Sequence, residues 1–128
     1  MKYLLDTHTA LWALENKIKL PETVKAIIDD VSLPLCVSII SAWEIAIKVS
    51  IGKLNFAGGS AFFIEKMRQN GIEMLDIKSS HVENVETLPF IHRDPFDRLL
   101  VATALADGMT ILTSDENIRK YGVRWVWL

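Results

Sequence analysis

The chain has 128 residues, half of them hydrophobic, and a formal net charge of −2; this length predicts one domain, residues 1–128, with a full core. The charge excludes the strong basic excess of many nucleic-acid binders, so a nucleic-acid site would need its acids in a cleft and its cations around it. The longest uncharged apolar stretch, residues 33–43, is too short to cross a bilayer, and the single cysteine excludes a disulfide framework, so we expect a cytoplasmic protein without a membrane partner.

Short apolar segments typical of strands alternate with segments of helical periodicity along the chain. In chain order, the predicted elements are a strand at residues 2–6, helices at 10–15 and 21–31, a strand at 35–37, a helix from 38 or 41 to 50, a helix at 60–69, a strand at 72–77, helices at 79–88 and 95–107, a strand at 110–112, a short helix up to 120 and a strand at 124–128. This alternation predicts an α/β fold with a parallel sheet covered on both faces.

The helix at residues 95–107 has the clearest end signals. Asp94 fits the N-cap, Pro95 the first helical position and Gly108 the left-handed terminator. Between these ends the helix is apolar on nearly every face, so we expect it to be buried on all sides. Asp97 lies in its first turn, where either the helix dipole or a metal or catalytic site explains a carboxylate.

Four carboxylates are predicted to lie together. Asp6 and Asp115 each follow a predicted strand, and Glu44 and Asp97 each lie near the start of a predicted helix. In a parallel sheet these positions emerge at the same edge, beyond the carboxyl ends of the strands, where ligands bind. In the helix that contains Glu44, this residue forms one narrow polar stripe with Ser41 and Lys48, and the other positions from 39 to 49 are apolar.

Each acid also has a purely structural interpretation. Ser41 and Glu44 match a capping box, Glu44 and Lys48 match a favourable i, i+4 pair, and Asp6 and Asp115 match caps of the segments that follow them. However, two carboxylates ~4 Å apart repel by about 4 kcal/mol at an effective dielectric near 20, so four at one edge require a cation. Carboxylate oxygens without thiols select Mg²⁺ or Mn²⁺, whose matching chemistry is phosphoryl or phosphodiester hydrolysis.

Other candidate residues surround these acids. Hydroxyls that could orient a carboxylate or a water are Thr7, Thr113 and Ser114. The cations closest in sequence to the predicted cleft, and thus candidate phosphate contacts, are Lys48, Lys53, Arg93 and Arg98. His8 and His92 are either ligands or, as is commoner, hydrogen-bonded structural histidines, and His81 is expected to be solvated. Trp125 and Trp127 are expected to make packing or dimer contacts.

Four blocks of sequence carry a family resemblance. They are DTHTALW at residues 6–12, SAWEIAIK with GKL at 41–48 and 52–54, HRDPFDRLL at 92–100, and LTSD at 112–115. Together they span the chain in order, and they resemble PIN-domain proteins, most of all the VapC-type toxins of type II toxin–antitoxin pairs.

The resemblance implies a fold, a chemistry and partners. The fold would be a three-layer α/β/α sandwich with a central, mostly parallel sheet. The activity would be that of a Mg²⁺- or Mn²⁺-dependent endoribonuclease acting on single-stranded or structured RNA, in a homodimer inhibited by a small cognate antitoxin. Carried over by position, the acidic site is Asp6, Glu44, Asp97 and Asp115, with Asp94 as a cap. Many PIN domains have Asn where this chain has His8.

Two other functions stay open at this point. A PIN-like scaffold that binds a partner without catalysis would keep the same fold. A receiver-type or phosphotransfer domain would need an acidic pair after the first strand and a lysine after the last core strand, whereas this chain has Asp6 alone and Asp115 in place of that lysine. The favoured hypothesis is hydrolysis in which a water attacks the phosphate in line, leaving a 5′-phosphate and a 3′-hydroxyl.

Overall fold

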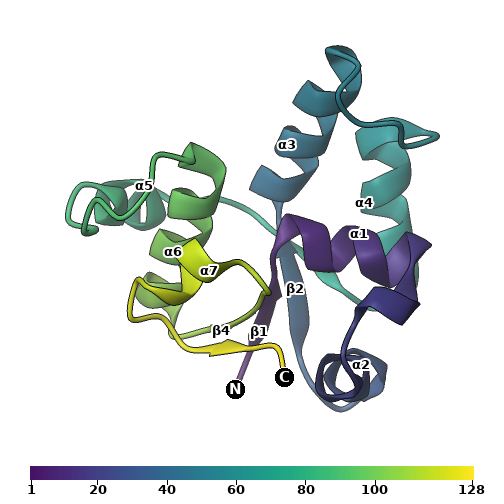
Figure 1. The fold of residues 1–128 in the computed structure, drawn as a ribbon, viewed down its shortest axis with the longest axis horizontal. Coiled ribbons are helices and arrows are strands. Elements are labelled where there is room, and N and C mark those ends of the chain that lie inside the picture. The colour runs from purple at the N-terminus through teal and green to yellow at the C-terminus, as the bar shows by residue number, and fades with distance from the viewer.

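The computed structural model describes residues 1–128 and contains one five-stranded sheet (Figure 1). The strands are β1 (Tyr3–Leu5), β2 (Leu35–Ser38), β3 (Glu73–Leu75), β4 (Thr110–Leu112) and β5 (Trp125–Val126). Their order is β3-β2-β1-β4-β5, and every neighbouring pair is parallel. The predicted parallel sheet is confirmed, although β1, β3 and β5 are shorter than expected.

Helices cover both faces of this sheet. They are α1 (Thr7–Glu15), α2 (Glu22–Asp29), α3 (Ile39–Ser50), α4 (Gly59–Gln69), α5 (Ser79–Val85), α6 (Pro95–Asp107) and α7 (Glu116–Arg119), with a 3₁₀ turn at Lys17–Lys19. None of them combines the length and the apolar surface that a membrane crossing requires. Figure 1 shows α5, α6 and α7 on one side of the sheet and α1 and α4 on the other.

Two cores lie between these layers, because successive strand residues point to opposite faces of a sheet. Leu4 packs into the core that contains the buried residues of α6 and α7, whereas its neighbour Leu5 packs into the core that contains those of α1, α2 and α4. Helix α3 contributes Ile40 to the first core and Ile45 to the second. This arrangement is the predicted three-layer α/β/α sandwich.

The winding of the chain determines where a ligand would bind. From β1 the sheet extends to β2 and β3 on one side and to β4 and β5 on the other. The boundary between β1 and β4 is therefore the topological switch point, beyond whose carboxyl ends ligands of open α/β sheets bind. Asp6 follows β1 and Thr113 follows β4 at this boundary. Receiver domains have the strand order 2-1-3-4-5, so the observed order excludes the receiver-type alternative.

Side-chain caps set the starts of two helices, one earlier than predicted and one at the first of its two predicted positions. Helix α1 begins earlier than residue 10, since the Asp6 carboxylate accepts a hydrogen bond from the Thr9 backbone N–H at 2.9 Å. Helix α3 is capped by Ser38, whose hydroxyl accepts from the Ile40 N–H at 3.0 Å. The capping box predicted at Ser41 is therefore wrong, and Ser41 is instead a fully buried residue inside the helix.

Helix α6 has the predicted ends but not the predicted burial. Asp94 accepts hydrogen bonds from the backbone N–H groups of Phe96 and Asp97, and Gly108 has the left-handed φ of 67°. However, α6 belongs to an outer layer, so one of its sides faces solvent and Leu105 is 41% exposed. The expectation that this helix is buried on all sides is wrong.

Phe63→Ala is expected to lower the free energy of unfolding by about 3–5 kcal/mol, because the fully buried ring would leave a cavity in the core beside α4. The neighbouring Phe62 is 43% exposed, so Phe62→Ala is a matched control with an expected loss of about 1 kcal/mol. Urea unfolding followed by circular dichroism measures both. Equal losses for the two variants would contradict this placement of the core.

Candidate functional site

A polar cleft of about 280 Å³ lies at the carboxyl edge of the sheet, and it contains all four predicted acids. Its lining consists of Asp6, Thr7, His8, Glu44, Lys48, Asp94, Asp97, Ser114 and Asp115. These residues come from the start of α1, from the middle and last turn of α3, from the start of α6 and from the turn between β4 and α7. Five carboxylates thus face one lysine, and no lining residue is hydrophobic.

Asp6 is held in the cleft by two threonines. Its Oδ1 accepts from the Thr9 backbone N–H at 2.9 Å, and its Oδ2 accepts from the Thr113 hydroxyl at 2.5 Å. The side chain is only 6% exposed, and burial raises the pKa of Asp6 although these hydrogen bonds act in the opposite direction. Asp6 therefore has a fixed orientation in surroundings that disfavour its charge.

Glu44 is held by a hydroxyl and a cation. Thr7 donates its hydroxyl hydrogen to Oε1 at 2.7 Å, and the Thr7 oxygen lies 2.8 Å from the Ser41 hydroxyl. Lys48 Nζ lies 2.6 Å from Oε2, in the i, i+4 pairing that the sequence predicted. Glu44 is 5% exposed, whereas the side chain of its counterion Lys48 is 39% exposed, so a buried carboxylate is paired with a partly exposed cation.

Asp97 occupies the third position of α6. Its Oδ2 lies 3.1 Å from Nε2 of His92, and its backbone N–H donates to the Asp94 carboxylate. Burial raises the pKa of Asp97 to about 7; the hydrogen bond from His92 lowers it, whereas the negative charges of Asp94 and Asp115 raise it. Unlike Glu44, Asp97 has no lysine or arginine partner.

Asp115 is the N-cap of α7. Its Oδ1 accepts from the backbone N–H groups of Asn117 and Ile118 at 2.8 and 3.0 Å, and its Oδ2 makes no hydrogen bond. One carboxylate oxygen of Asp115 is thus still free in the cleft. The structural interpretation of Asp115 as a cap is correct, but capping uses only half of the carboxylate.

The residues of the cleft fit a hard divalent cation. Carboxylate and hydroxyl oxygens are the ligands that Mg²⁺ and Mn²⁺ prefer. Burial, and then repulsion by Asp94 and Asp115, raise the pKa of Asp97, and either a proton or a cation relieves both effects. No three His, Cys, Asp or Glu side chains converge closely enough to enclose an ion by themselves. Mg²⁺ does not need such a cage, because it binds through one or two carboxylates and retains several of its waters.

The predicted phosphate contacts do not all reach the cleft. Lys48 lines it, and Lys53 and Arg93 are exposed residues outside its lining. Arg98 is 8% exposed, and its guanidinium stacks on the ring of Phe90 at 4.7 Å. The interpretation of Arg98 as a phosphate contact is therefore wrong, because its side chain is buried and does not line the cleft.

The three histidines have different surroundings. His8 lines the cleft, and its ring packs edge-on against Trp12. His92 contacts Asp97 and also Tyr121, a residue that the sequence did not single out because no motif surrounds it. His81 is fully buried, with Nε2 2.9 Å from Asp107. The expectation that His81 is solvated is wrong, because α5 packs this ring against the end of α6.

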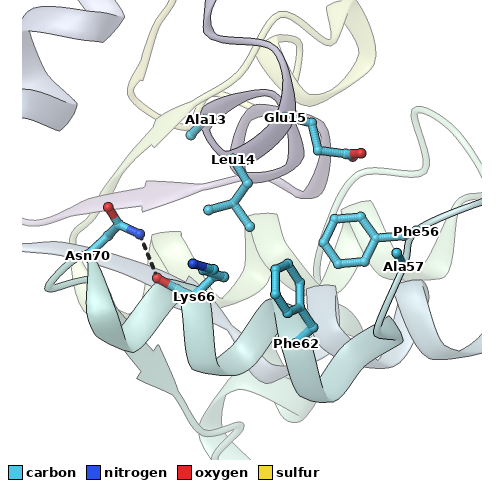
Figure 2. Close-up of a pocket in the computed structure, with 8 residues that line it drawn as sticks. All are labelled: Ala13, Leu14, Glu15, Phe56, Ala57, Phe62, Lys66 and Asn70. Carbon is cyan, nitrogen blue, oxygen red and sulfur yellow. Dashed lines mark hydrogen bonds between the residues drawn. The ribbon is translucent and has the colours of Figure 1, made fainter.

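A second hollow, of about 310 Å³, lies between α1 and α4 (Figure 2). Its lining residues are Ala13, Leu14, Glu15, Phe56, Ala57, Phe62, Lys66 and Asn70. Figure 2 shows the rings of Phe56 and Phe62 facing the side chain of Leu14. With a single carboxylate and a mainly apolar lining, this hollow cannot perform the chemistry of the acidic cleft.

The family model of the PIN domain matches residues 3–123. The chain belongs to the PIN domain family. This match covers the four acids Asp6, Glu44, Asp97 and Asp115 and all the sequence blocks that carry the predicted resemblance. No curated protein matches the chain by sequence.

Solved structures show the same PIN fold at low sequence identity. The chain is similar to VapBC2 from Rickettsia felis, solved bound to a DNA fragment from its promoter, with a TM-score of 0.73, 17% identity and 98% of each chain covered. It is also similar to VapBC-1 from nontypeable Haemophilus influenzae, with a TM-score of 0.70, 18% identity and coverage of 98% and 97%. The chain is similar as well to FitAcB from Neisseria gonorrhoeae, with a TM-score of 0.63 and 19% identity, and the match covers 96% of this chain and 95% of that chain.

Proposed function

We propose that this PIN domain, spanning residues 1–128, is a Mg²⁺- or Mn²⁺-dependent endoribonuclease that cleaves single-stranded RNA. The observation that carries the proposal is the convergence of four carboxylates, from four separate segments, in one polar cleft at the switch point of the sheet. PIN domains are in general nucleases that use divalent metals, which supports the same assignment.

Asp6, Glu44, Asp97 and Asp115 are the residues that would hold the ion, directly or through water. A bound Mg²⁺ or Mn²⁺ supplies neutralisation of the phosphate charge and activation of a water. The chain's own contribution is to position these carboxylates: Thr113 holds Asp6, and capping of α7 holds Asp115. These contacts keep the acids in place as an anionic phosphate approaches.

Cations around the cleft would bind the RNA backbone. Lys48 lies in the lining, 2.6 Å from the Glu44 carboxylate, so it can contact a phosphate once an ion takes over the charge of Glu44. The exposed Lys53 and Arg93 would contact the strand farther from the cut. Ser114 lines the cleft and can orient a water or a phosphate oxygen. This separation of acids and cations reconciles a net charge of −2 with an RNA substrate.

The biological role that fits this activity is that of a toxin restrained by a cognate antitoxin. VapBC2 and VapBC-1, which share the fold of this chain over almost their full length, support this role, as does a toxin–antitoxin complex from Klebsiella pneumoniae with a TM-score of 0.63. We propose the same kind of protein partner here, and a homodimer as the working form.

A binding scaffold without catalysis is the second candidate. Two observations favour it: Glu44 already has Lys48 as a counterion, and no three of the acids converge on one point. Such a scaffold would bind its partner through the same fold but would neither take up Mg²⁺ nor cleave RNA.

Cleavage of a labelled single-stranded RNA by the purified protein tests these alternatives. We expect cleavage in Mg²⁺, none in EDTA, and products with 5′-phosphate and 3′-hydroxyl ends. A 2′,3′-cyclic phosphate product would contradict the mechanism, because it forms when the RNA's own 2′-hydroxyl attacks. An absence of both cleavage and calorimetric Mg²⁺ binding would favour the scaffold.

A further inference from the structure

The hydroxyl of Tyr121 is the centre of a buried hydrogen-bond network beside the cleft. It lies 3.0 Å from Nη1 of Arg98, 3.3 Å from the backbone nitrogen of His92 and 2.7 Å from Nδ1 of the His92 ring. Nη1 of Arg98 also donates to the Pro89 carbonyl at 3.1 Å. Tyr121 is 6% exposed and Arg98 is 8% exposed, so water does not compete strongly for these bonds.

The donors and acceptors of this network determine where its protons lie. A guanidinium and a backbone N–H can only donate, so both lone pairs of the Tyr121 oxygen are used as acceptors, from Arg98 and from His92 N–H. The one phenol hydrogen is left to donate. Its best acceptor is Nδ1 of His92 at 2.7 Å, because the His92 carbonyl at 3.5 Å is beyond the usual O–H···O range.

This arrangement selects one tautomer of His92. If Nδ1 accepts the phenol hydrogen, the neutral imidazole carries its proton on Nε2. Nε2 lies 3.1 Å from Oδ2 of Asp97, so it donates to that carboxylate. One oxygen of Asp97 is thus held by His92, and the other stays free for the cleft.

We propose that Arg98, Tyr121 and His92 form a positioning relay, in which the Tyr121 hydroxyl fixes the His92 tautomer that donates to Asp97 and orients it toward the cation. This inference rests on the proposed function and assigns a new role to three residues that lie outside the lining of the cleft. Hydrogen bonds of this kind behind a metal-binding residue change metal affinity or activity by roughly 10- to 100-fold when removed.

The tautomer can be tested without metal and without activity. Long-range ¹⁵N–¹H NMR spectra of the histidine rings, recorded on the metal-free protein, should show Nε2 protonated and Nδ1 unprotonated in His92. Tyr121→Phe removes the phenol hydrogen and should abolish this single-tautomer pattern. Tyr3→Phe removes a phenol outside the network and should leave it unchanged. A protonated Nδ1 in the wild type, or an unchanged pattern in Tyr121→Phe, would overturn the proposal.

Variants of His92 and Tyr121 test whether the hydrogen-bond network affects metal binding and catalysis in the cleft. We expect His92→Ala and Tyr121→Phe to weaken Mg²⁺ binding in calorimetry by about 10-fold or more, and to lower kcat by a similar factor with KM for RNA nearly unchanged. His92→Gln keeps an N–H donor near the position of Nε2 and should restore most of both losses. Tyr3→Phe is the control for each measurement.

The outcomes separate this proposal from the proposed function. If the wild type cleaves RNA and His92→Ala and Tyr121→Phe cleave at its rate with its Mg²⁺ affinity, the relay is wrong and the nuclease assignment stands. If the wild type does not cleave RNA, the nuclease assignment fails, while the NMR pattern and the Mg²⁺ affinities of the variants still decide the relay. A failure of His92→Gln to restore binding would also count against the relay.

Discussion

Asp97→Asn is expected to lower the rate of Mg²⁺-dependent RNA cleavage by roughly 10²- to 10³-fold, the effect of losing a few kcal/mol of charge stabilisation in the transition state. Asparagine keeps the size of the side chain and an oxygen, but it cannot balance the charge of a divalent cation. The rate is measured on labelled single-stranded RNA under single-turnover conditions.

The same variant should be at least as stable as the wild type when no metal is present. Asp97 is a buried carboxylate near the charges of Asp94 and Asp115, and the amide removes that repulsion. A matched control is Asp29→Asn, which removes only an exposed carboxylate paired with Lys17 at 3.3 Å. This control should cleave RNA at the wild-type rate. Full activity in Asp97→Asn would remove Asp97 from the proposed site.

In the metal-free protein, the contribution of Asp97 to the free energy of unfolding is expected to fall as the pH rises from 4 to 8. The pKa of Asp97 in the folded protein is about 7, above its ordinary value of 3.8. Between these values the folded state keeps a proton that the unfolded state has released, so this contribution is complete below about pH 4 and is lost as the pH rises through 7. The raised pKa of Asp6 acts in the same direction.

The size of this component is roughly 2–4 kcal/mol, because each unit of pKa difference corresponds to about 1.4 kcal/mol. Urea unfolding in EDTA at pH 5 and pH 8 measures it as the difference between the wild type and Asp97→Asn, which cannot titrate at this position. Identical pH dependence in the two proteins would show that Asp97 is an ordinary carboxylate.

Mg²⁺ should reverse this loss, because the ion competes with the proton for the same carboxylate. We expect Mg²⁺ to raise the Tm of the wild type clearly at pH 8 and only slightly at pH 5, since a ligand that binds the folded state stabilises it by mass action. The increase should be much smaller in Asp97→Asn at both pH values. An equal increase in both proteins would indicate binding elsewhere.

Local chemistry explains why some features could be predicted from the sequence. The ends of α6 follow from Asp94, Pro95 and Gly108, because capping, a fixed φ and a left-handed residue each act within one helical turn. The alternation of apolar strands and amphipathic helices is equally local, and it was enough to predict a parallel sheet covered on both faces and the edge at which Asp6 and Asp115 emerge.

Features that depend on distant segments were predicted less well. From the local sequence, Ser38 and Ser41 were equally suitable N-caps for α3. In the folded protein Ser38 is the N-cap, and Ser41 is buried against Thr7. His81 and Arg98 carry polar groups that an isolated helix would expose to solvent. Only the packing of α5 on α6, and of Phe90 and Tyr121 around the guanidinium, shows that both are buried.

The sequence by itself therefore determined the order of the elements, the parallel sheet and the four acids, since each depends on residue type and short-range periodicity. The tertiary structure alone decided the long-range contacts that hold Asp6 and that place His92 beside Asp97. Thr113 reaches Asp6 across 107 residues of sequence, and Tyr121 reaches His92 across 29. Such contacts depend on strand order and helix packing, which bring together side chains that no local pattern relates.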